Sequence, residues 1–308
     1  MARLCEGRVA IVTGGARGVG REHCLMLAEH GAKVIVNDLG GDRAGKGHDV
    51  GPAQQVVNEI KAKGGEAVAN GDDVSDWNGA KRMIDQAVSA FGKLDAIVLN
   101  AGILRDRMLV NMTEEEWDAV IAVHLKGTFA PARWAAAYWR EQSKAGKPVS
   151  GRIINTTSVS GIYGNPGQTN YGAAKAGIAS FTNIAALELA RYGVTVNAVA
   201  PVALTRMTEG LGPAPETDEE REARSPRWIA PIVTWLASEE AGDVSGRVFE
   251  ASGQVLAVAE GWVRGPRHEP VDDPTVLGPI VRDMLAAARP NSGMNGEPGG
   301  WPQTTIKA

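Results

Sequence analysis

Short apolar runs alternate along the chain with segments that have a helical pattern. The runs in the first third of the chain cover residues 9–12, 33–36, 67–69 and 94–99. Continuous apolar runs of this length are typical of strands that are buried on both faces, and their alternation with helices is typical of a parallel sheet. The length of 308 residues allows one or two domains. The pattern predicts a single-domain α/β fold, a Rossmann-like doubly wound parallel sheet with helices on both faces.

A glycine-rich turn follows the first apolar run and leads into a helical stretch over residues 21–29. Glycines allow a tight turn and a close approach to a pyrophosphate, which the free N–H groups and the dipole of a helix N-terminus attract. A strand, such a turn and a helix form the first unit of a dinucleotide-binding fold. The alternative is a glycine-rich connection that binds nothing. The residues of this turn that we expect to bind the cofactor are Gly14, Arg17, Gly18, Val19 and Gly20.

An acidic residue ends the second apolar run. Asp38 lies 20 residues after Gly18, where a carboxylate accepts hydrogen bonds from the adenosine ribose hydroxyls. The same carboxylate would repel a 2′-phosphate, so NAD is favoured over NADP. Arg17 argues in the other direction, because an arginine in the turn is able to pair with that phosphate. Because Asp38 would repel the 2′-phosphate directly, we expect the cofactor to be NAD.

Polar and small residues follow the third and fourth runs. Ligands of open α/β sheets bind at the carboxyl ends of the strands, so Asp73 and Asn100 are expected near the adenine and the inner ribose. The alternative is turn chemistry, since Asp, Asn and Gly all favour turns. The expected cofactor contacts at these two strand ends are Asp73, Val74, Asn100, Ala101 and Gly102.

Tyr171 and Lys175 lie four residues apart, and Ser158 lies thirteen residues before Tyr171. Positions i and i+4 share one face of a helix. A free phenol has a pKa of about 10 and is a poor base at neutral pH. A nearby lysine cation favours the phenolate and lowers its pKa, which gives a usable acid/base, and Ser158 is able to hydrogen-bond the oxygen of an alcohol or carbonyl. By itself the spacing also fits a solvated helix face.

Together these motifs resemble the short-chain dehydrogenase/reductase family over residues 6–262. The resemblance implies that Ser158, Tyr171 and Lys175 are catalytic, and that Tyr171 and Lys175 also contact the cofactor, where Lys175 bonds the nicotinamide ribose hydroxyls. It further implies that Pro201 and Thr205 belong to the segment that covers the nicotinamide. The family usually has Asn at the position of His124. The backbone carbonyl of that Asn holds a water that leads protons to the lysine, and His124 is able to keep this role through its main chain. The alternative is a helix-face histidine with a local partner.

Within the family, the chain resembles the branch of the (3R)-hydroxyacyl-CoA dehydrogenase domain of peroxisomal multifunctional enzyme type 2 (17β-hydroxysteroid dehydrogenase type 4) and its bacterial relatives. The resembling segments are 36–41, 101–107, 160–165 and 259–262. The resemblance implies NAD and the oxidation of a fatty or steroid side-chain (3R)-hydroxyacyl-CoA by a homodimer or homotetramer. Two alternatives remain open: an NADPH-dependent 3-oxoacyl-[acyl-carrier-protein] reductase, and a non-catalytic protein that senses the cofactor.

The expected organisation is a catalytic domain over residues 1–265 and a C-terminal extension over 266–308. The catalytic domain contains an insertion at 40–52, which belongs to the branch, and a substrate lid at about 205–228. The extension is rich in Pro and Gly and has one amphipathic piece, 276–288. Two alternatives are open: the extension docks on a neighbouring subunit, or its last dozen residues are disordered.

Composition limits the partners. A net charge of −4 without a basic cluster argues against nucleic acid or an anionic membrane surface. No apolar run reaches membrane length and no signal-peptide pattern is present, so we expect a soluble, cytoplasmic protein. Cys5 and Cys24 are expected to be reduced thiols in or near the core, and the five histidines do not form a metal ligand set.

Overall fold

The computed structural model describes residues 3–42, 44–209 and 214–299. They build an eight-stranded sheet in the order β3-β2-β1-β4-β5-β6-β7-β8. Seven strands are parallel and β8 pairs with β7 in the antiparallel direction. The strands are β1 (Val9–Thr13), β2 (Lys33–Asn37), β3 (Glu66–Asn70), β4 (Ala96–Leu99), β5 (Gly151–Thr156), β6 (Val194–Pro201), β7 (Val248–Ala251) and β8 (Leu256–Ala259). The predicted doubly wound parallel sheet is confirmed.

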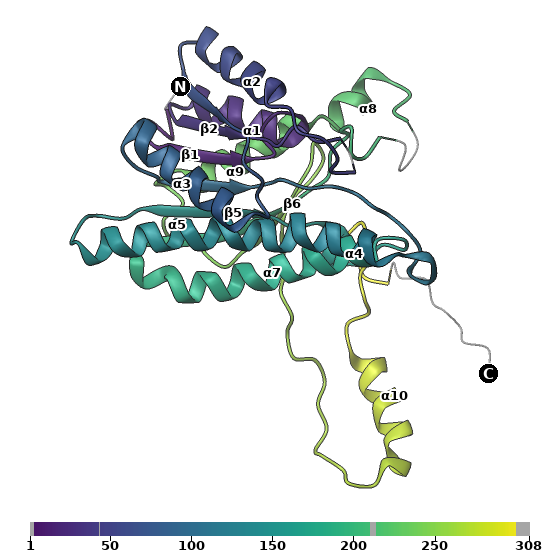
Figure 1. The fold of residues 1–308 in the computed structure, drawn as a ribbon. Helices are drawn as coiled ribbons and strands as arrows, with labels where there is room; N and C mark the ends of the chain where they lie inside the picture. The colour runs from purple at the N-terminus through teal and green to yellow at the C-terminus, as the bar shows by residue number, and fades with distance from the viewer. Residues whose placement is uncertain (1–2, 43, 210–213, 300–308) are drawn as a thin grey trace.

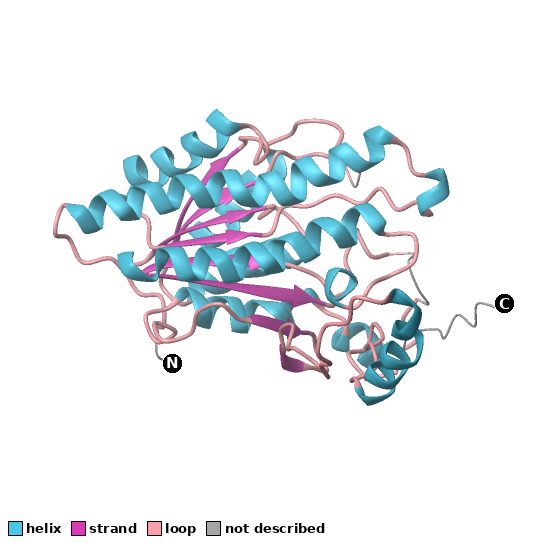
Figure 2. Ribbon diagram, turned by 90° about the horizontal axis from the view of Figure 1, so that it is seen from below, coloured by secondary structure: helices cyan, strands magenta, loops and turns pink. Residues whose placement is uncertain are grey.

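Helices cover both faces of this sheet (Figures 1 and 2). The helices are α1 (Gly18–Glu29), α2 (Gly51–Ala62), α3 (Trp77–Phe91), α4 (Glu114–Ile121), α5 (Gly127–Lys144), α6 (Val159–Ile162), α7 (Thr169–Leu189), α8 (Asp218–Ala223), α9 (Ala230–Ala237) and α10 (Leu277–Ala287). Short 3-10 turns cover Leu109–Asn111, Ala190–Tyr192, Pro226–Ile229 and Pro274–Val276, and a π-helical turn, Ala122–Lys126, joins α4 to α5.

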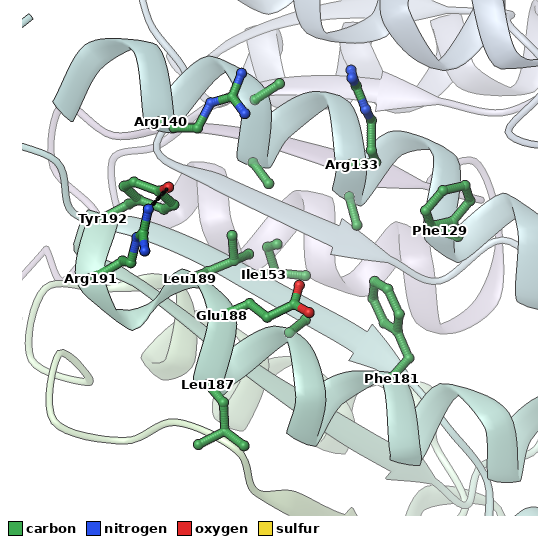
Figure 3. Close-up of a pocket in the computed structure, with 14 residues that line it drawn as sticks. Phe129, Arg133, Arg140, Ile153, Phe181, Leu187, Glu188, Leu189, Arg191 and Tyr192 are labelled. Atoms are coloured by element: carbon green, nitrogen blue, oxygen red, sulfur yellow. Dashed lines mark hydrogen bonds between the residues drawn. The ribbon is translucent and has the colours of Figure 1, made fainter. Parts of the chain in front are cut away.

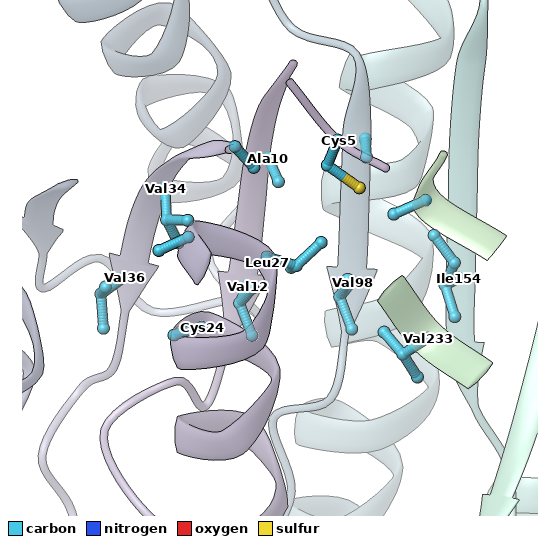
Figure 4. Close-up of a cluster of buried hydrophobic side chains, with 14 of the residues drawn as sticks. Cys5, Ala10, Val12, Cys24, Leu27, Val34, Val36, Val98, Ile154 and Val233 are labelled. Atoms are coloured by element: carbon cyan, nitrogen blue, oxygen red, sulfur yellow. The ribbon is translucent and has the colours of Figure 1, made fainter. Parts of the chain in front are cut away.

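Two buried apolar clusters hold the layers together. The first lies between the sheet and α1, α2 and α9, and includes Cys24, Leu27 and Leu236 (Figure 4). The second lies on the opposite face, against α3, α5 and α7. Strands buried on both faces have no polar side, which explains why the sequence shows continuous apolar runs.

The strand order reverses at β1, which lies between β2 and β4. Thr13, the last residue of β1, is in register with Asn37 of β2 and with Leu99 of β4. The carboxyl ends of the three strands therefore meet at one point of the sheet edge, the switch point at which such folds bind ligands.

The ranges predicted as insertion and lid contain helical elements. Residues 51 and 52, the last of the predicted insertion, form the first turn of α2, because Pro52 has the fixed backbone angle that favours a helix start. The lid region contains α8 and the turn before α9. Residue 43 of the insertion and residues 210–213 of the lid lie outside the described residues.

The C-terminal extension leaves the body and returns to it. The predicted amphipathic piece is confirmed as α10, which projects away from the sheet and its helices (Figure 1). After α10, residues 291–299 form a small turn, the tail turn, closed by hydrogen bonds from Gly293 N to Glu297 O and from Gly299 N to Asn291 O. Residues 300–308 lie outside the described part of the chain. Within the described ranges, no helix is long and apolar enough to cross a membrane.

Candidate active site

The glycine positions of the turn after β1 have no room for side chains. Gly14 and Gly18 have backbone φ angles of +64° and +51°, which L side chains rarely adopt. A side-chain carbon on Gly20 would lie 2.0 Å from the Gly14 carbonyl oxygen. Arg17, the residue before α1, makes no side-chain cap, and the first helical turn contains no acidic residue. The N-terminus of α1 thus keeps backbone N–H groups for an anion, and this turn fits the pyrophosphate of a dinucleotide.

Thr13 and Asn100 fasten this turn to β4. The buried Thr13 hydroxyl accepts hydrogen bonds from the backbone N–H groups of Asn100 (2.9 Å) and Ala101 (3.1 Å). The Asn100 amide donates to the carbonyl oxygens of Thr13 (3.1 Å) and Gly14 (3.2 Å). The amide nitrogen of Asn100 therefore holds the glycine turn, and the predicted contact with the inner ribose would have to use the remaining atoms of this residue.

Asp38 and Asp73 both lie at the expected edge. One Asp38 oxygen accepts from Ala16 N at 3.1 Å and the other from Gly40 N at 2.8 Å, so the carboxylate is fixed beside the glycine turn. One Asp73 oxygen accepts from the backbone N and the hydroxyl of Ser75. This is the turn chemistry that the sequence left open for Asp73.

Several further predicted residues surround the same edge. Val74 is buried, and a carbon on Gly127 would lie 2.6 Å from its side chain. Pro201 ends β6, and the Thr205 methyl lies 3.3 Å from a carbon placed on Gly18. The start of the lid thus lies beside the glycine turn.

Ser158, Tyr171 and Lys175 meet at the end of β5. Ser158 precedes α6, and its hydroxyl hydrogen-bonds the Tyr171 phenol. Tyr171 and Lys175 lie on α7, with the lysine nitrogen 5.5 Å from the centroid of the tyrosine ring. That nitrogen donates to the Thr156 carbonyl oxygen at 2.6 Å. The structure brings together the three side chains that sequence spacing selected.

The pKa values of this pair differ from the expectation. Loss of water raises the pKa of Tyr171 to about 12, although the hydrogen bond from Ser158 lowers it in part. Burial lowers the pKa of Lys175 to about 7. The prediction that Lys175 lowers the pKa of Tyr171 is therefore wrong for the chain alone, because desolvation of the phenolate dominates and the buried lysine gives up part of its own charge.

His124 lies in the π-helical turn between α4 and α5, and its side chain is buried. Its Nε2 atom lies 3.1 Å from the backbone N and 2.8 Å from the backbone O of Ile103, and the ring stands edge-on to Tyr171, 5.1 Å between centroids. Burial lowers its pKa to about 3, so the ring is neutral. The His124 carbonyl accepts from Gly127 N and keeps a second lone pair. Gly102 leaves room for the His124 ring, since a side-chain carbon placed on Gly102 would lie 2.5 Å from that ring.

Sequence reasoning missed Asn170, the residue before Tyr171. Asn170 is fully buried, and its amide donates to the carbonyl oxygens of Arg105 (3.0 Å) and Glu116 (3.1 Å). Its side-chain oxygen accepts from Tyr171 N at 2.7 Å. The residue joins the loop after β4, helix α4 and the start of α7. The only feature of the sequence that pointed to Asn170 was the presence of an Asn near the start of a predicted helix.

Cys5 and Cys24 are free thiols with no exposed surface, as predicted. Among the described residues, no three His, Cys, Asp or Glu side chains are grouped so that they would hold a metal ion.

Comparisons with known proteins agree with this geometry. A family model described as short chain dehydrogenase matches residues 8–216, more than half of the chain. The chain belongs to this family. A crystal structure of a short chain dehydrogenase from Mycobacterium avium superimposes with a TM-score of 0.85 at 52% sequence identity, and covers 94% of this chain and 98% of that one.

Three curated relatives show the range of activities nearby. The chain is 44% identical to the hydroxyacyl-CoA dehydrogenase ChsB1 of Mycobacterium tuberculosis, over 92% of this chain and 90% of that protein. It is 45% identical to the peroxisomal multifunctional enzyme type 2 of Drosophila melanogaster, over 91% of this chain but 44% of that longer protein. A 3-oxoacyl-[acyl-carrier-protein] reductase of Staphylococcus aureus is 43% identical over 79% of this chain and 96% of its own length. The chain is thus an oxidoreductase that uses a nicotinamide cofactor and a small-molecule substrate.

Proposed function

We propose that this protein is an NAD-dependent dehydrogenase that oxidises a (3R)-hydroxyacyl-CoA, with a fatty or steroid side chain, to the 3-oxoacyl-CoA. The observation that carries the proposal is the meeting of Ser158, Tyr171 and Lys175 at the carboxyl end of β5, on the same edge of the parallel sheet as the glycine turn. The names of two relatives, a hydroxyacyl-CoA dehydrogenase and a multifunctional enzyme type 2, support the thioester class.

The nicotinamide supplies the hydride acceptor when it is bound, and the chain supplies orientation and proton transfer. Ser158 donates to the substrate oxygen and fixes it next to the Tyr171 phenol. Burial keeps Tyr171 protonated in the chain alone. The positive charge of a bound nicotinamide would favour its phenolate, which would then take the hydroxyl proton as the hydride leaves the same carbon. Lys175, with a pKa of about 7, is able to accept or release a proton at neutral pH. We assign it the transfer of that proton away from Tyr171, with the His124 carbonyl beside the route.

The choice of NAD rests on Asp38. Its carboxylate is held by Ala16 N and Gly40 N at the edge of the glycine turn, where it would face the adenosine ribose. A 2′-phosphate placed there would meet a fixed negative charge. Arg17 offers little compensation, since its exposed guanidinium points to the Gly41 carbonyl at 3.5 Å.

The test is a set of initial rates with NAD and NADP against hydroxyacyl-CoA thioesters of different bulk. We expect a clear preference for NAD, turnover of the (3R) isomer, and loss of turnover in Tyr171→Phe while the dinucleotide still binds. Wild-type turnover in Tyr171→Phe would refute the assignment. A preference for NADPH with acyl-carrier-protein substrates would favour the reductase alternative, and binding of the dinucleotide without turnover would favour the sensor.

We also propose that the protein is a homo-oligomer. On α10, Leu277, Val281 and Leu285 form one apolar stripe that is 39–68% exposed. On the outer side of α5 and α7, a groove of about 540 Å³ is lined by apolar side chains such as Phe129 and Leu187 with arginines at its rim (Figure 3). Apolar surface of this kind on the same chain supports self-association. Light scattering at several concentrations tests it, and a monomer throughout would refute it.

A further inference from the structure

Helix α6 is a single turn, and the residue that caps it is Ser158. The Ser158 hydroxyl accepts from Ser160 N at 3.1 Å while it bonds Tyr171. Isolated helices this short are unstable, because one turn cannot offset the cost of nucleation. The direction of the Ser158 hydroxyl therefore depends on the contacts that hold α6 in place.

One contact is the side of α7. A carbon on Gly161 would lie 2.6 Å from Ala176 N and 2.7 Å from the Lys175 Cβ, so the two helices touch with nothing between them. This contact fixes the distance of α6 from α7. A further contact beyond the end of α6 would fix its orientation as well.

The other contact lies at that end. Tyr163 follows the last residue of α6, and its phenol donates a hydrogen bond to the Glu250 carboxylate of β7. Side chains alternate along a strand. Phe249 and Ala251 pack into the first apolar cluster, so Glu250 lies on the opposite face, toward α6 and α7. Burial and the carboxylate raise the pKa of Tyr163 above its ordinary value, which keeps the phenol protonated as a donor.

The C-terminal extension reaches the same pair. A carbon placed on Gly296, in the tail turn, would lie 3.4 Å from the Tyr163 hydroxyl oxygen and 3.7 Å from the ring carbon that bears it. The hydrogen bond between Tyr163 and Glu250 is therefore partly covered by the extension. Reduced access of water strengthens a hydrogen bond to a charged group.

We propose that Glu250, acting through Tyr163, is a positioning residue that orients Ser158 toward the substrate oxygen. The inference rests on the proposed function, because the orientation matters only if Ser158 binds the alcohol. The contacts described for this pair lie at the end of α6, on β7 and at the tail turn, so the pair should affect the chemical step and leave dinucleotide binding unchanged.

Three variants and a matched control test it. Tyr163→Phe and Glu250→Ala each remove one partner, and the double variant removes both. Misplacement of a catalytic group by about 1 Å is able to cost roughly a hundredfold in rate, so we expect kcat to fall at least about tenfold in each, with the KM for NAD unchanged. Because both single variants break the same bond, the double variant should be no worse than either one. Glu250→Gln keeps an oxygen that accepts from the phenol and should restore kcat to within about threefold of wild type.

The proposal would be overturned if the fold-losses in kcat of the two single variants multiplied in the double variant, or if kcat of the single variants did not change. A rise in the KM for NAD together with the fall in kcat would overturn it too. Hydrogen exchange at the amides of Gly161 and Ile162, which both bond the Ser158 carbonyl, gives a readout without turnover. Exchange should accelerate in Tyr163→Phe and not in Glu250→Gln. If wild type oxidises no secondary alcohol, the proposed function fails, and the exchange rates alone decide whether the pair holds α6.

Discussion

Replacing Thr13 with Val tests the connection between β1 and β4 on which the glycine turn depends. The Thr13 side chain is 1% exposed, and its Oγ1 accepts from Asn100 N at 2.9 Å and from Ala101 N at 3.1 Å. Valine has almost the same shape but no acceptor. The substitution therefore leaves two backbone donors without their partner, and it also removes the long hydrogen bond from the hydroxyl to the Val98 carbonyl oxygen (3.4 Å).

The magnitude follows from the cost of an unpaired donor, about 1–3 kcal/mol each. Asn100 and Ala101 are half-buried, so water is able to replace part of the hydrogen bonding that their N–H groups lose. We expect Thr13→Val to lower the free energy of unfolding by about 2–4 kcal/mol. Thr13→Ser keeps the acceptor and removes one methyl group, at a cost of about 1 kcal/mol.

Urea unfolding, followed by tryptophan fluorescence, measures both variants. The same proteins should be titrated with NAD. Because Asn100 holds the Gly14 carbonyl, we expect Thr13→Val to weaken NAD binding at least about tenfold and Thr13→Ser to leave it close to wild type. If the two variants unfold at the same urea concentration, the hydroxyl does not stabilise this edge and the reasoning is refuted.

Three further predictions follow from single positions. Gly20→Ala should abolish NAD binding, measured by calorimetry, because its new carbon would lie 2.0 Å from the Gly14 oxygen, whereas Gly261→Ala, with nothing within 4 Å, should bind like wild type. Burial lowers the pKa of His23 to about 3 in the folded protein. Above the ordinary histidine pKa of about 6.5, the neutral side chain makes its full contribution to the free energy of unfolding. This contribution is lost as the pH falls, because the unfolded chain binds the proton first. His23→Leu should therefore reduce the loss of unfolding free energy between pH 7.5 and pH 5 by roughly 2 kcal/mol in urea titrations, and an unchanged loss would contradict the assignment. Asp38→Asn should raise kcat/KM for NADP relative to NAD at least about tenfold in initial-rate measurements, since it removes the charge that repels the 2′-phosphate, and an unaltered ratio would exclude Asp38 from cofactor selection.

Local patterns predicted the strands, the glycine turn and the group of Ser158, Tyr171 and Lys175. These features depend on residues close in sequence, through strand burial, turn geometry and helix periodicity. The roles of Thr13 and Asn170 were not predictable, because each hydrogen-bonds backbone groups that other elements bring into place. The same holds for the pKa of Tyr171, which burial raises although the neighbouring lysine suggested the opposite.

The burial of Cys5 and Cys24 has a practical consequence for spectroscopy. Desolvation raises the pKa of the Cys5 thiol to about 11 and that of Cys24 further still, and thiolates are the species that react with alkylating reagents. A cysteine introduced on the exposed face of α10 would then be the only fast-reacting thiol of the native protein. A fluorophore or spin label attached there would report on the surroundings of α10 without any need to remove the natural cysteines.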